Sequence, residues 1–247
     1  MKKLLIILLA LCSLASAPAP VSSALAIDMV SVQGGTFRMG CTSEQGNQCS
    51  GGERPVRNVT LGDFHIGKYP VTQAQWEAVM GNNPSHFKGG SLPVENVSWN
   101  DVQQFISKLN SMTGRRYRLP TEAEWEFAAR GGRNSRGFIY SGSNNLDEVA
   151  WHGGNSGSRT HPVGTKRANE LGIHDMTGNV WEWVSDWFGT YPSTDQTNPQ
   201  GPSSGSGRVI RGGCWSRDAG GCRVSSRHDR TPGIRYNLVG FRLASSP

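Results

Sequence analysis

The sequence predicts one mixed α+β domain, from residue 27 to residue 247, that contains much irregular structure. Glycine and proline are abundant, with 32 Gly and 13 Pro in 247 residues, and they favour turns and loops over long regular elements. Short runs that alternate apolar and polar residues predict strands, and capping boxes mark the starts of helices. No internal repeat or linker divides the chain, whose length allows a substantial core.

Residues 1–26 are expected to be a secretory signal peptide. Two lysines precede an apolar run from Leu4 to Leu14. This is typical of the charged start and short hydrophobic core of a signal, and it is too short to span a membrane. Cleavage is expected after Ala26, while Cys12 leaves open attachment as a lipoprotein. We therefore expect an exported protein, secreted or at the cell surface, with membrane contact only through a lipid anchor if one is attached.

Export permits disulfide bonds, and four cysteines follow the predicted signal peptide. Cys41 and Cys49 bracket a short polar loop with no competing structure, so we predict that they pair. Cys214 and Cys222 either form a second pair or leave Cys222 as a buried thiol. Neither a CxxC motif nor a zinc-type Cys/His spacing is present.

The first half of the domain begins with strands. Residues 29–33 and 36–40 each read as a strand, with a Gly34-Gly35 turn between them, and residues 59–66 form another alternating run. Each run has the period of two that a half-buried strand requires.

Three helices are predicted by their caps. Thr72 is the N-cap of a helix that continues to Met80 and ends at Gly81. Ser98 opens a capping box for a longer helix that ends near Gly114. The apolar face of that helix comprises Val102, Phe105, Ile106 and Leu109. Thr121 opens the third helix, whose predicted inner face is Trp125, Ala128 and Ala129.

The remainder is irregular apart from two short strands, at residues 178–183 and 208–211. Net charge is +6, and 19 of the 25 basic residues are arginine, but no basic run exceeds two residues. We therefore expect arginines that pair with carboxylates and carbonyls, and no nucleic-acid partner.

Residues 211–242 have a different pattern from the rest of the chain. Anchor-like phrases such as Arg211-Gly212-Gly213, Cys222-Arg223-Val224 and Gly240-Phe241-Arg242 alternate with short polar runs. Neither a period of two nor one of 3.6 fits these runs, which predicts loops held by a rigid scaffold. Such loops commonly carry function.

Five phrases, in order, closely resemble the formylglycine-generating enzyme (sulfatase-modifying factor) family. They lie at residues 34–40, 92–99, 118–126, 178–183 and 240–242. The resemblance covers the chain from about residue 28 to its end. It implies a variant of the C-type lectin fold, with a twisted antiparallel core, helices packed outside and little regular structure.

The enzymes of this family bind copper through two cysteines that follow an Arg-Gly-Gly-Ser phrase. Here Cys214 stands where the family has Ser, and Cys222 follows it with seven residues between them. Neither cysteine matches a catalytic position by motif, so we expect no copper and no catalytic residue. Formylglycine synthesis, or another oxidoreductase activity of this family, remains the alternative function.

The phrase at residues 175–182 is similar to the calcium loop of this family. By position, Asp175 and Glu182 would supply carboxylate oxygens, and Gly178 and Val180 would supply backbone carbonyls. Hard oxygen donors from a tight turn suit Ca²⁺. The alternative is that the two acidic residues cap turns or pair with arginine.

The layout of residues 211–242 also resembles the variable proteins of diversity-generating retroelements, in which copying errors at template adenines alter the gene's 3′ end. The residue types between the anchors can all arise from Asn codons by changes at adenine. Lys, Glu, Gln, Met and Trp cannot, and none occurs at residues 216–238. The resemblance implies a ligand-binding face comprising Trp215, Ser216, Arg217, Asp218, Gly220, Gly221, Ser226, His228, Asp229, Arg230, Ile234, Tyr236, Asn237 and Leu238.

We therefore predict an exported, surface-displayed binding protein that recognises a protein or carbohydrate ligand through residues 211–242. Trp215 is interpreted either as a binding platform or, preferably, as part of the core. A structural subunit of an envelope assembly is a third interpretation.

Overall fold

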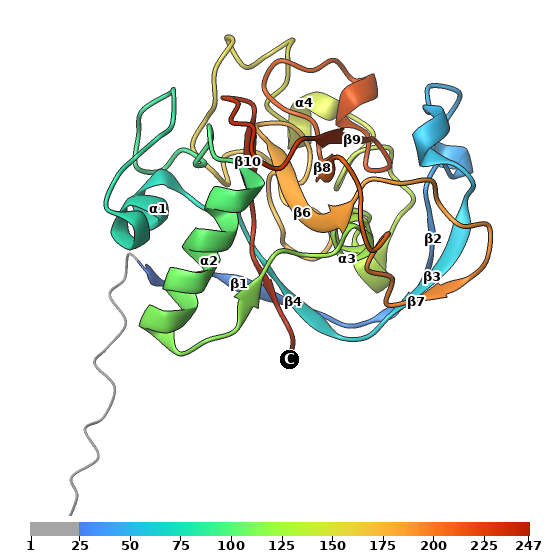
Figure 1. Ribbon diagram of the computed structural model, residues 1–247. Helices are drawn as coiled ribbons and strands as arrows, with labels where there is room; N and C mark the ends of the chain where they lie inside the picture. The colour runs from blue at the N-terminus through green and yellow to red at the C-terminus, as the bar shows by residue number, and fades with distance from the viewer. Residues whose placement is uncertain (1–24) are drawn as a thin grey trace, which may run out of the picture.

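The computed structural model describes residues 25–247, so the predicted signal peptide lies outside the described residues except for its last two positions. Three small sheets form the framework (Figure 1). The central sheet has the strand order β10(Val239–Phe241), β6(Trp181–Trp187), β8(Arg208–Arg211), β9(Arg227–Arg230). Within it, β10 runs parallel to β6, whereas β8 is antiparallel to both β6 and β9.

The other two sheets are built from strands that lie far apart in the sequence. One has the order β1(Met29–Val32), β4(Phe64–Gly67), β11(Ala244–Ser245), β5(Tyr117–Arg118), so the two ends of the domain share a sheet. The other has the order β2(Gly35–Met39), β3(Arg57–Leu61), β7(Gln196–Thr197).

The predicted strand at residues 59–66 is in fact two strands, β3 and β4, which belong to different sheets. The division is explained by a close contact between two turns of the backbone, one at Gly34 and one at residues 62–63. Gly34 donates its N–H to Asp63 Oδ1 at 2.8 Å, and a Cβ on Gly34 would lie 2.3 Å from the Leu61 carbonyl oxygen. The chain therefore bends at Gly34 and at residues 62–63 together, and β1 and β2 do not form a hairpin with each other.

All three predicted helices are confirmed. Helix α1(Gln73–Met80) has Thr72 as N-cap and ends at Gly81 in the left-handed conformation, with φ 79°. Helix α2(Trp99–Thr113) begins with the Ser98 capping box and buries the four predicted apolar residues. Helix α3(Glu122–Ala129) also has its predicted capping box, but all eight of its residues are buried rather than one face. A short helix, α4(Leu146–Val149), was not predicted.

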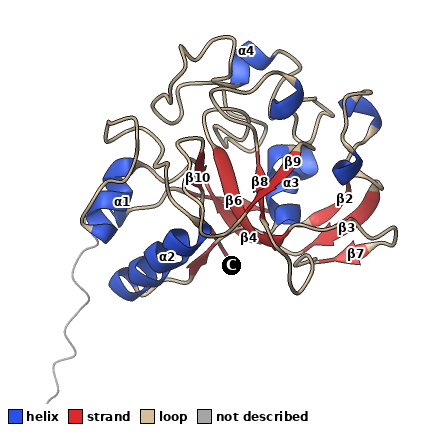
Figure 2. Cartoon of the chain, turned by 45° about the horizontal axis from the view of Figure 1, so that its top comes forward, coloured by secondary structure: helices blue, strands red, loops and turns tan. Residues whose placement is uncertain are grey.

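Two hydrophobic clusters cover the two faces of the central sheet. Helices α1 and α2 pack on one face, and α3 with strands β2 and β3 packs on the other (Figure 1 and Figure 2). Along β6 the side chains alternate, so Trp181 and Trp183 join the first cluster and Val184 joins the second. None of the helices within residues 25–247 is long and apolar enough to cross a membrane.

Two predictions about the later strands were wrong. The strand predicted at residues 178–183 begins three residues later, because the chain turns at Gly178, with φ 77°, and at Asn179, with φ 58°. Residues 211–242 are not entirely loop, since they contain β9 and β10. The polar sequence of β9 gives no local strand signal, and its pairing with β8 creates the strand.

Candidate ligand-binding face

Four buried arginines fix the C-terminal segment, residues 211–242, to the rest of the fold. The ion pairs are Arg211–Glu126, Arg223–Glu53, Arg227–Glu122 and Arg242–Glu182. The partners lie between 60 and 170 residues apart in the sequence. Because an unpaired charge is costly in a buried site, each pair ties one point of the segment to one point of the scaffold. Arg211, Arg223 and Arg242 lie in the predicted anchor phrases.

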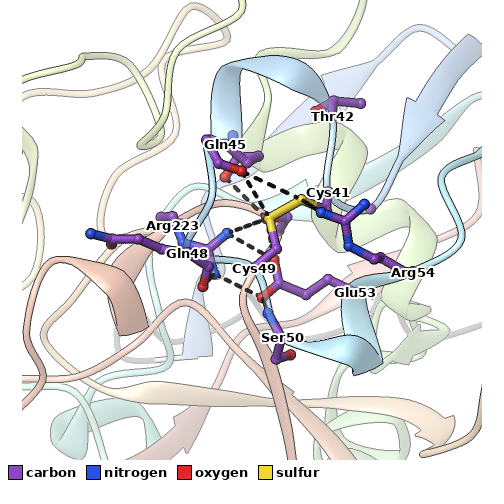
Figure 3. The surroundings of a disulfide bond; sticks show 12 residues. Cys41, Thr42, Gln45, Gln48, Cys49, Ser50, Glu53, Arg54 and Arg223 are labelled. Atoms are coloured by element: carbon purple, nitrogen blue, oxygen red, sulfur yellow. Dashed lines mark hydrogen bonds and ion pairs between the residues drawn. A yellow bond between two sulfur atoms is a disulfide. The ribbon is translucent and has the colours of Figure 1, made fainter.

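The Arg223 anchor is held by the predicted cysteine loop (Figure 3). Cys41 and Cys49 are joined by a disulfide bond. Arg223 donates to both carboxylate oxygens of Glu53, at 2.7 and 2.8 Å, and to the Gln48 carbonyl oxygen at 3.2 Å. Burial opposes ionisation of Glu53, but the hydrogen bonds from Arg223 and Ser225 hold its pKa below the usual value. The disulfide loop therefore supports the segment from outside it.

The positions between the anchors lie mostly at the surface. Ser216, Asp218, His228 and Tyr236 are exposed, and nine further predicted positions are half-buried: Trp215, Arg217, Gly220, Gly221, Asp229, Arg230, Ile234, Asn237 and Leu238. Tyr236, at 43% exposed, and Met112, at 51%, are the exposed large hydrophobic side chains among residues 25–247. An exposed tyrosine offers broad amphipathic contact at a low cost in conformational entropy.

Two of these side chains, Arg217 and His228, lie beside Trp181 at the start of β6, and two others, Arg230 and Tyr236, lie beside each other. The Trp181 ring contacts His228 with centroids 5.2 Å apart, and the Arg217 guanidinium lies 5.9 Å from its centroid. Arg230 lies 5.9 Å from the centroid of the Tyr236 ring. Burial lowers the pKa of His228, and the charges of Arg217 and Arg230 lower it further. We call Arg217, His228, Arg230 and Tyr236 the recognition cluster.

The recognition cluster carries two arginines, and no carboxylate among residues 25–247 forms an ion pair with it. Within the described chain, neither Arg217 nor Arg230 forms an ion pair with a carboxylate, unlike the four anchor arginines. The side chain of Arg230 donates only to a backbone carbonyl, that of Asp229. These guanidinium groups therefore keep donors available for a ligand.

Backbone contacts hold this part of the segment in place while leaving side chains free. The Tyr236 carbonyl accepts from Asn96 N–H at 2.8 Å, and the Leu238 carbonyl accepts from Trp181 N–H at 2.8 Å. The Trp215 indole donates to the Asn237 carbonyl at 3.0 Å, and its ring meets Phe87 edge to face at 5.6 Å. Trp215 is therefore a half-buried support whose backbone and indole are both fixed.

Not every predicted position belongs to this face. Ser226 is wrong as a surface position, because it is only 4% exposed and its carbonyl accepts from Arg211 at 2.8 Å. Asp229 packs closely against Gly207. A Cβ added to Gly207 would lie 2.1 Å from the Oδ2 atom of Asp229. Asp218 accepts from Gly221 N–H within a turn. Trp181 and Phe87 were missed, because they lie outside the segment and only tertiary contact brings them to it.

The predicted calcium residues differ in how their side-chain oxygens are used. Asp175 keeps one buried carboxylate oxygen without a protein partner, and burial raises its pKa. Both oxygens of Glu182, however, accept from Arg242, and one also accepts from the Trp125 indole at 2.7 Å. Glu182 therefore follows the arginine-pairing alternative. Gly178 and Val180 lie in the turn before β6, and no group of three metal-ligating side chains occurs within residues 25–247.

Cys214 and Cys222 are both free and fully buried. Burial raises the pKa of each thiol, in the case of Cys222 to about 12. The thiolate is the form that binds metals and attacks substrates, and burial disfavours that form at both positions. The sequence left open whether Cys214 and Cys222 form a second disulfide or Cys222 is a buried thiol. In the structure both are buried thiols.

Comparisons with known proteins identify the class of this chain. The Sulfatase-modifying factor enzyme 1-like domain matches residues 15–247, so the chain belongs to the family that this domain defines. Chaperone protein LppX of Paenibacillus barcinonensis is 35% identical, over 91% of this chain and 92% of its own. The formylglycine-generating enzyme of Mus musculus is 30% identical, over 94% of this chain and 78% of its own.

Two solved structures share the fold over nearly the whole chain. Treponema denticola variable protein 1 is 34% identical with a TM-score of 0.81, and the match covers 89% of this chain and 95% of that one. PvdO from Pseudomonas aeruginosa is 28% identical with a TM-score of 0.79, covering 94% and 100%. These matches confirm the predicted family, the predicted fold class and the similarity to a variable protein.

Proposed function

We propose that this protein is an exported, surface-displayed ligand-binding protein whose residues 211–242 are diversified by a retroelement and form the recognition surface. One observation carries the proposal: four arginines of the segment are buried in ion pairs, whereas Arg217 and Arg230 form none within the described residues. The similarity to Treponema denticola variable protein 1 supports it. Binding would use a preformed surface and involve no chemical step.

This separation is what a diversified receptor requires. Substitutions at surface positions away from caps, cores and ion pairs usually change stability by less than about 0.5 kcal/mol. Many sequences at the recognition cluster should therefore fold equally well, because the backbone is held by hydrogen bonds that do not depend on the side chains. The proposed ligand is a protein or carbohydrate at the cell surface.

Export is part of the proposal and is supported by two features. The Cys41–Cys49 disulfide suits an oxidising compartment, where such bonds form and persist. The apolar run after two lysines near the start of the chain has the composition of a signal peptide. Lipid attachment at Cys12 would anchor the protein to the membrane surface, and simple cleavage would release it.

The test is to sequence the DNA that flanks the 3′ end of the gene. We expect a second copy of the segment that encodes residues 211–242, differing only at adenines, beside a reverse-transcriptase gene. The expected differences fall on codons of the recognition cluster and spare codons of the four anchor arginines. Differences spread equally over both classes, or no second copy, would contradict the proposal.

A second candidate is an oxidoreductase like the formylglycine-generating enzymes, which the 30% identity to such enzymes favours. Its test is copper-dependent oxygen uptake with a cysteine-containing sulfatase peptide, comparing the wild-type protein with Cys222→Ala. Turnover that is lost in the variant would establish this activity. We expect no turnover, because both thiols are buried and have raised pKa values.

A further inference from the structure

A cavity of about 280 Å³ lies away from the recognition cluster. It is bordered by the ends of β2 and β6, the starts of β3, β9 and α3, and the loop around β7. Arg227 lines the cavity, whereas the next residue of β9, His228, belongs to the recognition cluster. Because successive side chains of a strand point to opposite faces, the cavity and the recognition cluster lie on opposite sides of β9.

Arg57, at the start of β3, is the unusual residue of the cavity wall. Its side chain is buried, at 7% exposed, and two of its three guanidinium nitrogens have no protein hydrogen-bond partner. The third donates to the Met39 sulfur at 3.5 Å, which is a weak acceptor. The guanidinium lies 3.6 Å from the centroid of the Tyr191 ring.

No carboxylate balances this charge directly. Within the described chain Arg57 forms no ion pair, although the four anchor arginines each form one. Burial lowers the pKa of Arg57, the neighbouring Tyr191 and the carboxylates of Glu122 and Glu126 oppose that shift, and Arg227 adds to it. A buried donor left without an acceptor typically costs about 1–3 kcal/mol, and a charged one costs more.

The acidic groups beside the cavity are already used or are neutral. Glu122 accepts from Arg227 with both oxygens and from the Tyr191 hydroxyl at 3.0 Å. Asp186 also lines the cavity, and burial together with the charge of Glu122 raises its pKa to about 7. In weakly acidic solution Asp186 is therefore protonated and does not neutralise Arg57.

The rest of the wall is largely apolar. Met39, Trp187, Pro192, Pro199 and Pro202 contribute to it, with the amides of Gln196 and Gln200 nearby. Small-ligand sites typically combine such a lining with a few polar groups that fix orientation. A guanidinium without a partner in this setting matches the planar shape of a carboxylate.

We infer that this cavity is a binding site for a small monocarboxylate with an apolar body. The carboxylate pairs with Arg57, and the apolar body packs against Trp187 and the prolines. This inference does not depend on the function proposed for residues 211–242. It concerns a different part of the protein and a different class of ligand.

The test uses benzoate and benzamide, which have similar shapes but differ in charge. We expect benzoate at millimolar concentration to raise the melting temperature of the wild-type protein at pH 6, and calorimetry to show at least tenfold weaker binding of benzamide. Equal effects of the two compounds, or no effect of benzoate, would overturn the inference. This comparison needs no variant.

Arg57→Met then locates the binding site, and Arg38→Met, at an exposed position of the neighbouring strand β2, is the matched control. We expect Arg57→Met to abolish the benzoate response and Arg38→Met to retain it. Without ligand, Arg57→Met should melt at the same or a higher temperature, because it removes a buried charge that has no partner. A full benzoate response in Arg57→Met would place the binding elsewhere and overturn the inference.

Discussion

Arginine serves two opposite purposes within residues 211–242. Arg211 and Arg242 are fully buried and each donates to a carboxylate from an earlier element. Arg217 and Arg230 are half-buried, lie beside aromatic rings and pair with no carboxylate of the described chain. Substitution of Arg211 or Arg242 is expected to destabilise the fold. Substitution of Arg217 or Arg230 is expected to change only what the surface contacts. On the proposed function, stability and recognition would therefore depend on different residues of one short segment.

The largest expected effect follows from breaking a buried pair. Arg242→Met leaves the carboxylate of Glu182 buried without its two hydrogen bonds from the guanidinium. We expect the free energy of unfolding to fall by about 3–5 kcal/mol in urea titrations. The control is Arg235→Met, which breaks the Arg235–Asp101 pair, where the arginine side chain is 55% exposed. That loss should stay below about 1 kcal/mol. Equal losses would contradict the distinction between anchors and surface arginines.

Asp186 is a buried carboxylate without an arginine ion pair, and it should make stability depend on pH. Burial and the charge of Glu122 raise the pKa of Asp186 to about 7 in the folded protein, whereas the ordinary value for aspartate is 3.8. The folded state therefore holds a proton that the unfolded state loses between these values, so stability falls as pH rises from about 4 to 7. The loss should be about 4 kcal/mol.

Asp186→Asn should remove most of this pH dependence and raise stability at pH 8. The amide oxygen can still accept from Glu122 N–H, as the carboxylate does at 2.9 Å. Urea unfolding at pH 5 and pH 8 measures the effect, with Asp195→Asn as the control on an exposed carboxylate. An unchanged pH slope in Asp186→Asn would show that Asp186 is ionised in the folded protein.

A smaller effect is expected from the disulfide that supports Arg223. Replacing Cys41 and Cys49 with serine should lower the free energy of unfolding by about 2 kcal/mol, because the bond closes a short loop. The same double variant should increase hydrogen exchange at Arg223 and Ser225, whose side chains contact that loop. Unchanged exchange there would show that the Glu53 ion pair holds the segment without help from the disulfide.

The sequence predicted local features better than tertiary ones. The helix starts at Thr72, Ser98 and Thr121 were correct because a capping box is contained within four residues. Strand β9 was missed because its residues are polar, and pairing with β8 determines its structure. The burial of all of α3 was also missed, because Glu122 and Glu126 pair inside the protein with Arg227 and Arg211, which lie far along the chain.

The candidate site was predicted in part for the same reason. The position of residues 211–242 followed from alternating anchors and polar runs, but the assembly around Trp181 did not, because that residue reads as ordinary core. Arg57 gave no signal at all. In the sequence, a single arginine in an alternating strand looks like an ordinary solvent-exposed arginine. Only the folded structure shows that the Arg57 side chain is buried without hydrogen-bond partners for two of its nitrogens.

The smallest effect on stability, and the largest on binding, is expected at the recognition cluster. Arg217→Ala, His228→Ala and Tyr236→Ala should each change the free energy of unfolding by less than about 0.5 kcal/mol. Their backbones keep the hydrogen bonds of Arg217 to Cys214 and Gly153 and of Tyr236 to Asn96, which do not involve the substituted atoms.

The triple variant Arg217→Ala/His228→Ala/Tyr236→Ala should therefore melt close to the wild-type protein while losing the ligand that the wild-type surface captures. Arg115→Ala, an exposed change far from the segment in sequence, provides the matched control for binding. A triple variant that still binds would place recognition outside the cluster. A triple variant that unfolds would show that these positions are required for the stability of the fold. Buried and exposed arginines would then no longer differ in the way proposed.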